Sequence, residues 1–363
     1  MKESAKKVTR CVKGIKAMRL LDGEGLFVGI DVHKKSFDLA LWSLERGLIR
    51  TWSQPADAQV VVKHLHRYAE HIKEIVYEAG PTGFGLVRIL RSAGFKAEVV
   101  APSMVPSTPA KRSKSDRLDC RKLAEFSSKK VLRFVQVPTE REEADRQVVR
   151  LHHQLSRKIR RIKQQIKSFL LLHGIKQPNG LRSWSNQAIK ELAELELDSE
   201  LRFALDVLLD EFRHFKQQRQ RVLEQIRKLA EAPRHEQDVA LMRSVRGVGP
   251  IVAMTVRTEM FTPERFKDAR DVAMYAGLAP LVSESGEKRC EGHIMKSGNP
   301  NLRMMLIEGA WQWVVWDTAA RARYNRLLRN TGNPKKAIVA MARHLVVLTW
   351  KLLVENSENR RAA

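Results

Sequence analysis

The chain has 363 residues, 43% of them hydrophobic and 29% charged, which exceeds the length of one typical domain, about 100–150 residues, and suggests two or three folded units. Lys and Arg number 66 against 41 acids, so the net charge is +25 and a polyanionic partner such as nucleic acid is expected. No apolar run approaches the ~18 residues of a membrane span or forms a secretory signal. Cys11, Cys120 and Cys290 are too scattered for a zinc site or a disulfide framework. The composition therefore excludes membrane, secreted and disordered classes and predicts a cytoplasmic protein.

The N-terminal part divides into a basic arm and an α/β unit. Residues 1–25 form the expected arm, because positions 1–21 hold seven Lys or Arg and one acid. From 26 to 140, short apolar runs such as LFVGIDV, FDLALW and EIVYEA alternate with helix-like runs. The order of three strands, a helix and further strand and helix alternation predicts a mixed sheet flanked by helices, of which the ribonuclease-H-like fold is one example.

Four acids in this unit stand out. Asp31 lies in an apolar strand, where burying an unpaired charge is costly, and Glu78 ends another strand. Asp116 and Asp119 are three residues apart, which places both on one face of a predicted helix. Such oxygen ligands suit Mg²⁺, with Mn²⁺ as an alternative, and two ions can assist phosphoryl transfer. Taken singly, each acid also has a structural explanation, such as a surface ion pair of Asp119 with Lys122.

Residues 141–235 are expected to form a long helical hairpin or coiled coil. Apolar residues recur from Val148 to Leu170 at spacings of three and four, and a second series runs from Leu201 to Leu229 with a mean spacing near 3.5. The stretch from Gln147 to Leu172 contains no acid, which favours contact with phosphates. Its candidate contacts are Arg157, Lys158, Arg160, Arg161, Lys163 and Lys167.

Residues 236–363 are expected to form a compact helical domain. Gly247 and Gly249, in SVRGVGP, are similar to the turn of a helix-hairpin-helix element, whose free backbone amides hold a phosphate; an ordinary tight turn is the alternative. Lys288, Arg289, Lys296 and Arg303 form a basic cluster suited to phosphate contact. Trp311, Trp313 and Trp316 are expected to be buried rather than to stack on bases.

Together these segments resemble a known family. The four acids stand in VGIDVHKK, YEAGPTG and KSDRLDCRKLA, and the C-terminal part carries FKDARDVAMYAGLAP, SGEKR and GHIMKSGNPNLR after SVRGVGP. In this order, from about Leu26 to Lys351, they resemble the DEDD-type insertion-sequence transposases related to the Piv and MooV DNA invertases. Cys120 departs from the alanine that is common after the fourth acid.

The resemblance implies a RuvC-like, ribonuclease-H-fold catalytic domain, a coiled-coil insert and a C-terminal transposase domain with a nucleophilic serine. The family serine follows GLAP in a Ser-Gly pair, which here is Ser285, while Ser283 and Ser297 stay open as alternatives. The resemblance further implies metal held by Asp31, Glu78, Asp116 and Asp119, a structured bridge RNA that guides target choice, assembly as a dimer or tetramer, and a prokaryotic, nucleoid-associated location. The four acids and the serine must then meet within one subunit or between two.

Other functions fit the same residues. A RuvC-like junction nuclease would use the four acids with water as the nucleophile, so that the need for Ser285 distinguishes it. A non-catalytic nucleic-acid-binding scaffold would explain the charge alone, and replacing Asp31 or Glu78 would then change nothing. A tyrosine recombinase fits less well, because only Tyr324 has arginine neighbours, and the G-x-S-x-G elbow of a hydrolase is absent.

Overall fold

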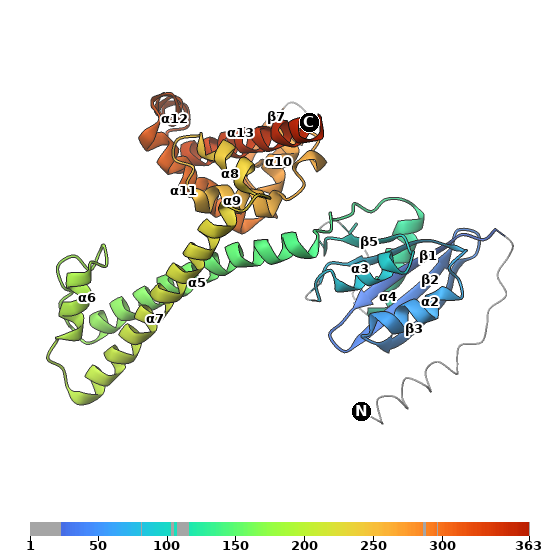
Figure 1. The fold of residues 1–363 in the computed structure, drawn as a ribbon, viewed down its shortest axis with the longest axis horizontal. Helices are drawn as coiled ribbons and strands as arrows, with labels where there is room; N and C mark the ends of the chain where they lie inside the picture. The colour runs from blue at the N-terminus through green and yellow to red at the C-terminus, as the bar shows by residue number, and fades with distance from the viewer. Residues whose placement is uncertain are drawn as a thin grey trace. The chain divides into compact units, whose positions relative to one another are not determined.

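The computed structural model describes residues 23–80, 82–102, 105–106, 116–285, 288–295 and 297–362, and does not describe the side chains of residues 116–118, 282–285, 288–291 and 361–362. Most of the basic arm expected at residues 1–25 lies outside the described residues. The chain divides into two compact units, Met1–Val137 and Pro138–Ala363 (Figure 1).

The first unit is built on a five-stranded mixed sheet. Its strands are β1 (Leu26–Val32), β2 (Ser36–Ser43), β3 (Gly47–Pro55), β4 (Ile72–Glu78) and β5 (Ala97–Val100), in the order β3-β2-β1-β4-β5. Strands β1, β2 and β3 are antiparallel, whereas β4 is parallel to β1 and to β5. Because parallel neighbours require a crossover, the helices α2 (Ala58–His66) and α3 (Gly85–Ser92) precede β4 and β5. This sheet is consistent with the ribonuclease-H-like fold expected from the sequence.

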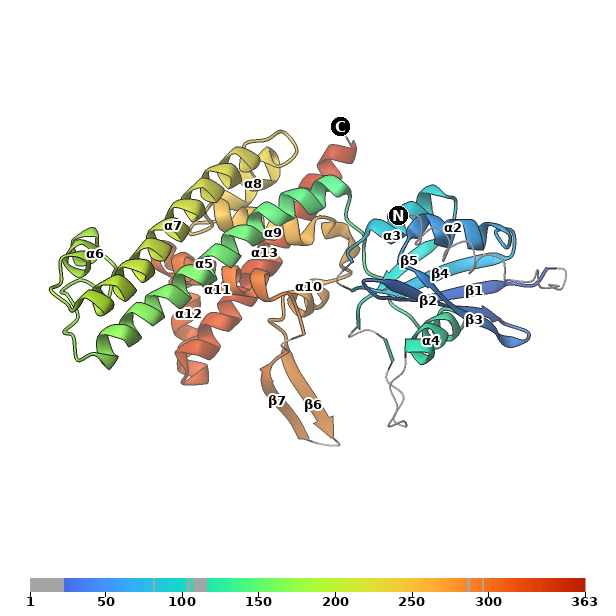
Figure 2. The same ribbon diagram turned by 90° about the horizontal axis from the view of Figure 1, so that it is seen from below.

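Helices cover both faces of the sheet, as Figure 2 shows. Alternate residues of each strand point to opposite faces, and the side chains of Val28 and Ile30 pack with those of α2 and α3 in the main core of the unit. The helix α4 (Asp116–Ser128) lies on the other face, where Cys120 and Ala124 pack against Ala40 of β2. The residues of β1, β2 and β4 that point away from the main core therefore face α4.

The second unit begins with two long helices joined by a short one. They are α5 (Glu140–Leu172), α6 (Asn186–Ala193) and α7 (Ser199–Ala230). Thr139 caps α5 in a capping box with Glu142, which explains where the helix begins. The two long helices pack against each other, with Ile162 and Ile166 beside Leu205 and Phe212 in one core.

The apolar series expected in α5 is buried from Leu155 to Leu170, but Leu151 is an exception with 39% of its surface exposed. Near that end of the helix His152 and His153 are buried instead, and His153 Nε2 lies 3.3 Å from Thr255 Oγ1. The buried face therefore turns there, because α5 leaves the seam with α7 and packs on the C-terminal helices.

The C-terminal part contains six α-helices and one β-hairpin among its described residues. The elements are α8 (Glu236–Arg243), α9 (Pro250–Met260), a 3₁₀ turn (Pro263–Arg265), α10 (Ala269–Tyr275), β6 (Pro280–Ser285), β7 (Lys288–Ile294), α11 (Pro300–Trp316), α12 (Thr318–Thr331) and α13 (Pro334–Ala362). Strands β6 and β7 pair only with each other and project from the helices (Figure 2). The expected helical domain is present, and this hairpin is an addition that the sequence analysis did not predict.

Among the described residues, α13 is the one helix that is long and apolar enough, by length and composition alone, to cross a membrane. Its apolar side chains have another explanation, because Met341, Leu345 and Val346 are fully buried in the core of the second unit together with residues of α9 and α11. It is therefore a core helix of this unit.

Candidate active site

Three carboxylates lie side by side on the face of the sheet that α4 covers. In the antiparallel pair of β1 and β2, Asp31 stands directly opposite Asp38. In the parallel pair of β1 and β4, Ile30 stands opposite Tyr77, so the next pair in that register is Asp31 and Glu78. All three acids point away from the main core, since their neighbours Ile30, Phe37 and Tyr77 point into it. The sheet thus brings Asp31 and Glu78 together, as expected, and adds Asp38.

Helix α4 lies directly on this row of acids. A Cβ atom on Gly29, two residues before Asp31, would clash with the Cys120 carbonyl oxygen and lie 2.6 Å from the Ala124 nitrogen. The backbone of α4 therefore approaches β1 at a distance that only glycine permits. Because Asp119 precedes Cys120 in the helix, the third carboxylate-bearing element is positioned over the end of β1.

The first turn of α4 holds the two remaining predicted acids. Asp119 Oδ1 lies 3.9 Å from Lys122 Nζ, so the surface ion pair considered above is present as a long contact. Asp116 is the first residue of α4, one turn before Asp119, and its side chain is outside the described part of the chain. The helix backbone thus places both acids at the same end of α4.

Cys120 of α4 lies close enough to the acidic row to feel the charges of its carboxylates. Cys120 is fully buried, and its burial, together with the charges of Asp38 and Asp31, raises the pKa of its thiol to about 12. His33 Nε2 lies 3.3 Å from Asp31 Oδ2 and can offset part of that charge when protonated. The Cys120 thiol is therefore neutral at ordinary pH, and a small neutral side chain is what the contact between α4 and β2 allows.

Oxygen donors of this kind suit a hard divalent cation. Like charges directly opposite in an antiparallel pair destabilise a sheet, so a cation beside Asp31 and Asp38 would relieve their repulsion. Among the side chains described, no three acids, histidines or cysteines already lie within reach of one ion. The oxygen donors of the row fit a hard divalent cation in kind.

The predicted serine lies in the other unit, at the tip of the β6–β7 hairpin. Ser285 is the last residue of β6 and pairs with Lys288 in register, while Ser283 pairs with Cys290. Figure 2 shows this hairpin extending from the helices, and Ser297 is exposed beyond its other end. The side chains of Ser283, Ser285, Lys288 and Arg289, and all of Lys296, lie outside what the structure describes.

Gly277 and Gly298 allow the chain segments at the base of this hairpin to pack closely against each other. Gly277 has φ +66°, and a Cβ atom there would lie 3.0 Å from the Met295 oxygen, while one on Gly298 would clash with the backbone of Gly277. Arg303 Nη1 donates to the Gly277 oxygen over 3.4 Å. The segment before β6 and the segment after β7 are therefore in backbone contact, and the predicted phosphate ligand Arg303 already has a structural partner.

A buried ion pair between Arg150 and Glu259 lies next to the segments at the base of the hairpin. Glu259 of α9 is fully buried, and Arg150 of α5 donates to both of its carboxylate oxygens over 2.8 Å. Asn299, which caps α11, donates to Glu259 Oε2 over 2.8 Å, and the Tyr275 hydroxyl donates to the Glu259 carbonyl over 2.7 Å. The long helix α5 is thus fastened to the segment that follows the hairpin.

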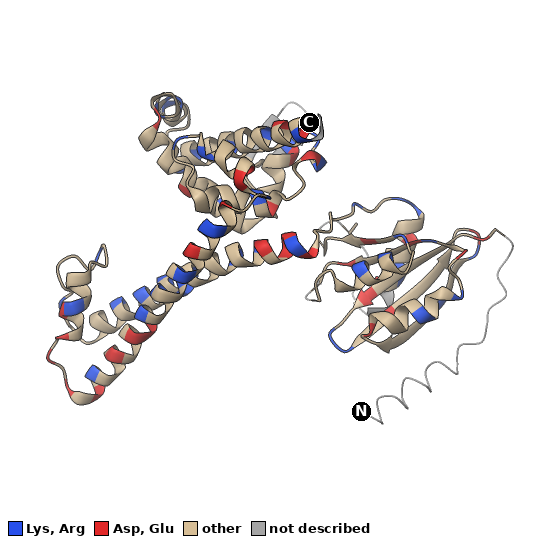
Figure 3. Cartoon of the chain, viewed as in Figure 1, with Lys and Arg blue, Asp and Glu red and all other residues tan. Residues whose placement is uncertain are grey.

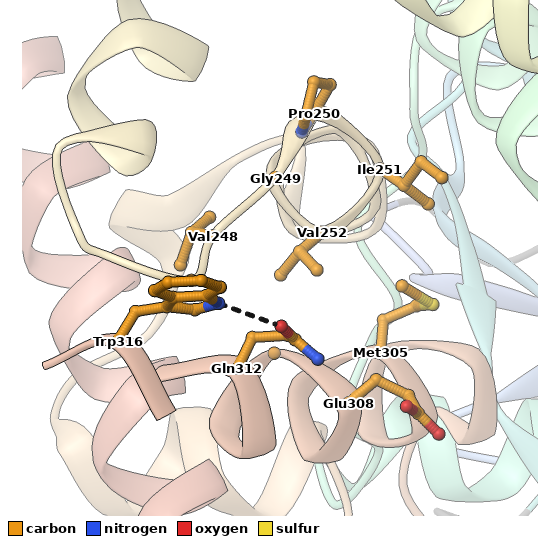
Figure 4. A pocket seen from close by; sticks show the side chains of 11 residues that line it. Val248, Gly249, Pro250, Ile251, Val252, Met305, Glu308, Gln312 and Trp316 are labelled. Carbon is orange, nitrogen blue, oxygen red and sulfur yellow. Dashed lines mark hydrogen bonds between the residues drawn. The ribbon is translucent and has the colours of Figure 1, made fainter. Parts of the chain in front are cut away.

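The Gly247–Gly249 turn lies beside an open cavity of about 500 Å³, shown in Figure 4. Gly247 has φ +87°, and a Cβ atom there would meet the backbone of α11 at Gln312 and Trp313, so close packing requires this glycine. Gly249 has open space around it and precedes α9. Apolar side chains such as Val248 and Trp316 line much of the cavity together with Glu308. Binding of a phosphate by this turn stays a prediction.

The basic face expected on α5 is present, and Figure 3 shows Lys and Arg gathered along the middle of the helix. Arg157, Arg160 and Arg161 are exposed. Two lysines have aromatic partners within the hairpin, with Lys158 Nζ 4.9 Å from the Phe215 ring and Lys163 Nζ 5.1 Å from the Trp184 ring. Lys167 is half-buried. The three arginines are the members of this face best placed to meet a phosphate backbone.

Sequence reasoning missed Asp38 and misjudged two tryptophans. Asp38 follows the start of an ordinary amphipathic strand, and only its register opposite Asp31 gives it importance. A signal was present, since an acid stands between two apolar residues, Phe37 and Leu39, in FDLALW. Trp311 and Trp316 are 39% and 64% exposed, so the expectation that they are buried was wrong.

Comparison with known proteins gives matches over most of the chain. A transposase family model of the DEDD type, found in IS110 elements, matches residues 28–175, and the model of the IS116/IS110/IS902 transposase family matches residues 239–325. The chain is 32% identical to the putative transposase y4qE of Sinorhizobium fredii, over 91% of this chain and 88% of that one. It is 26% identical to the transposase for insertion sequence element IS1533 of Leptospira borgpetersenii, over 79% of this chain and 85% of that one.

Proposed function

The chain belongs to the IS116/IS110/IS902 family of DEDD-type transposases, enzymes that cut and join DNA, and on this premise we propose that it exchanges DNA strands through a serine-linked intermediate assisted by a divalent metal. The observation that carries the proposal is the row of Asp31, Asp38 and Glu78 under the first turn of α4. Asp31 and Asp38 carry like charges on directly opposite residues, and such an acidic row suits an ion that acts on phosphates.

The ion would be held by Asp31 and Glu78 from the sheet and by Asp116 and Asp119 from α4. When bound, Mg²⁺ or Mn²⁺ would stabilise the negative charge that develops on the phosphate during strand transfer. The protein's own contribution is to hold donors from two strands and one helix in fixed positions, because α4 packs tightly on Gly29. Membership of a DEDD-type family supports a requirement for divalent metal, and Mg²⁺ is the ion proposed here.

We assign the nucleophile to Ser285. Its Oγ forms a bond to the phosphorus of one phosphodiester, while the bond from phosphorus to the deoxyribose oxygen on the opposite side breaks. The hydroxyl proton passes to water, and the leaving oxygen takes up a proton to become a free hydroxyl. A deoxyribose hydroxyl of the partner strand then attacks the phosphoserine and restores the serine. The position of Ser285 at the tip of a projecting hairpin supports this role, because a DNA backbone can approach it there.

Target choice by a guide RNA and assembly of several subunits complete the proposal. The family resemblance implies a bridge RNA, and base pairing to it would carry specificity without the helix-turn-helix or Cys/His finger for which the sequence gives no clear sign. Helix α5 offers Arg157, Arg160 and Arg161 to a nucleic-acid backbone. At the far end of the α5–α7 hairpin, Leu171, Leu172 and Phe203 are 80%, 79% and 71% exposed, which supports contact with a second subunit, as a coiled coil in a dimer or tetramer.

The competing function is a junction nuclease that uses water as the nucleophile. It is favoured by one observation, namely that the acidic row lies entirely within the first compact unit. Such an enzyme would cut DNA without forming a covalent bond to it, so the two functions differ in one measurable product.

Trapping a covalent protein–DNA adduct tests the proposal. The wild-type protein is incubated with element-end DNA, its flanking RNA and Mg²⁺, denatured and analysed by gel. We expect an adduct that is lost in Ser285→Ala and in Asp31→Asn and retained in the matched control Ser297→Ala. An adduct that persists in Ser285→Ala would move the nucleophile to Ser283 or Ser297, and cleavage without any adduct would support the nuclease.

A further inference from the structure

The helices α12 and α13 carry a long acid-free segment that none of the proposed roles uses. Between Asp317 and Glu355 the chain has eight Lys or Arg and no Asp or Glu. Surface helices of ordinary proteins mix charges of both signs, so a run of this length indicates a surface that meets an anionic partner. The segment includes all of α12 and most of α13.

Five of these basic side chains are exposed at one end of the pair of helices. They are Arg323, Arg326 and Arg329 of α12 and Lys335 and Lys336 in the first turn of α13. No ion pair joins any of the five to an acid within the described parts of the chain. Exposed basic residues elsewhere do find such partners, as Arg213 does with Asp210 over 3.0 Å. The five charges are therefore available to a partner.

Helix α12 is held rigidly on its neighbours although it buries little of its own surface. Ala320 is its one fully buried residue, and the Tyr324 ring lies 5.7 Å from the Trp311 ring of α11. Arg321 donates to the carbonyl oxygens of Val314 and Val315, which fastens the start of α12 to the end of α11. Gly332, with φ +61°, then ends the helix and turns the chain into α13. The exposed arginines thus stand on a fixed support.

His344 of α13 lies among these basic side chains, and their charges affect its pKa. Its Nδ1 lies 3.3 Å from Arg323 Nη1. Burial, followed by the charges of Arg323, Arg343 and Arg326, lowers the pKa of the imidazole. The histidine is therefore neutral at pH 7 and accepts a hydrogen bond from Arg323, and it adds no charge of its own to the surface.

We propose that Arg323, Arg326, Arg329, Lys335 and Lys336 form a docking surface for the phosphate backbone of double-stranded DNA, separate from the catalytic acids and from the basic face of α5. Exposed arginines without acidic partners, held on a packed helix, bind phosphates without reading sequence. DNA is chosen over RNA because cutting and joining DNA is the activity of the family, so the inference rests on the proposed function for its choice of partner. Duplex RNA is an outcome that the test distinguishes.

The test measures binding of a random-sequence DNA duplex by fluorescence anisotropy as salt is raised, with full-length protein and EDTA so that no cleavage occurs. The test variant is Arg323→Gln/Arg326→Gln/Arg329→Gln. Each lost phosphate contact reduces the slope of log affinity against log salt by about 0.9, so the triple variant is expected to reduce it by about 2 to 3 and to weaken binding at least about tenfold at low salt.

The matched control removes the same net charge elsewhere. It is Lys129→Gln/Lys190→Gln/Arg213→Gln, three exposed residues that already have acidic partners at 2.6, 3.7 and 3.0 Å. We expect the control to keep the wild-type slope, and circular dichroism confirms that both variants are folded. Equal loss in the two variants would overturn the inference, as would a larger loss for duplex RNA than for DNA. Failure of the wild type to bind DNA at all would instead refute the proposed function.

Discussion

Replacing Gly29 by alanine tests whether the close contact of α4 with β1 builds the acidic site. The new methyl group would overlap the Cys120 carbonyl oxygen and lie 2.6 Å from the Ala124 nitrogen. That is about 1 Å inside the ~3.5–4.0 Å at which heavy atoms pack best. Both neighbours belong to the backbone of α4, so no side-chain rotation can relieve the overlap, and the helix itself must move away from the sheet.

The expected cost follows from this displacement. Overpacking a core lowers the free energy of unfolding by about 1–3 kcal/mol, and Gly29→Ala should lie at the upper end of that range or beyond it. Because Asp119 is part of α4, the same movement of the helix should separate Asp119 from Asp31 and weaken the binding of Mn²⁺. The effect on the site is thus indirect and follows from the position of a helix.

Urea unfolding measures the stability change, and hydrogen exchange of peptides from α4 and β1 locates it. Gly85→Ala is the matched control, because Gly85 lies in the same unit at the start of α3 and a Cβ atom there has no neighbour within 4 Å. We expect the control to change the free energy of unfolding by less than about 0.5 kcal/mol. Equal stability of the two variants, with unchanged protection of α4, would refute the reasoning.

Three further predictions follow from single residues. Asp38→Asn should leave the fold intact and weaken Mn²⁺ binding several-fold in a titration followed by electron paramagnetic resonance; unchanged affinity would exclude Asp38 from the site. Glu259→Ala should lower the free energy of unfolding by roughly 3 kcal/mol, because it leaves the partly buried Arg150 without its partner, and a loss below 1 kcal/mol in a urea titration would contradict this. Burial lowers the pKa of His153 to about 4, below the ~6.5 of an unfolded histidine, so its contribution is fully present above pH 6.5 and is lost as the pH falls toward 4. Lowering the pH from 7 to 5 should therefore destabilise the wild type by up to about 2 kcal/mol more than His153→Gln, measured by urea unfolding at each pH; equal pH dependence of the two proteins would refute this.

Much of the site could be predicted from local patterns. Burying an unpaired acid in an apolar strand is costly, so an acid at such a position suggests a function, and this marked Asp31 and Glu78 before their strands were known to be neighbours. The three-residue spacing of Asp116 and Asp119 predicted a shared helix, and both lie in α4. The apolar series in α5 and α7 likewise predicted two long helices, and the structure contains them.

Other features required the tertiary structure. Leu151 follows the apolar spacing of α5 yet is exposed, because the partner of the helix changes from α7 to α9 along its length. The β6–β7 hairpin was missed because its sequence is polar and its strands pair only with each other. Asp38 gained its importance from register, which depends on a pairing between strands and cannot be seen in one strand alone.

By itself, the sequence determined the type of most main elements, although not of the β6–β7 hairpin, and it determined the positive charge, the four acids and the family, since these depend on residue identity and short-range spacing. Only the tertiary structure decided that Asp31, Asp38 and Glu78 share one face of the sheet and that Gly29 allows α4 to pack closely on that face. It also decided that the exposed arginines Arg323, Arg326 and Arg329 of α12 have no acidic partner among the described residues. These properties arise from contacts between segments far apart in the chain, and such contacts are set by packing and strand register rather than by local preference.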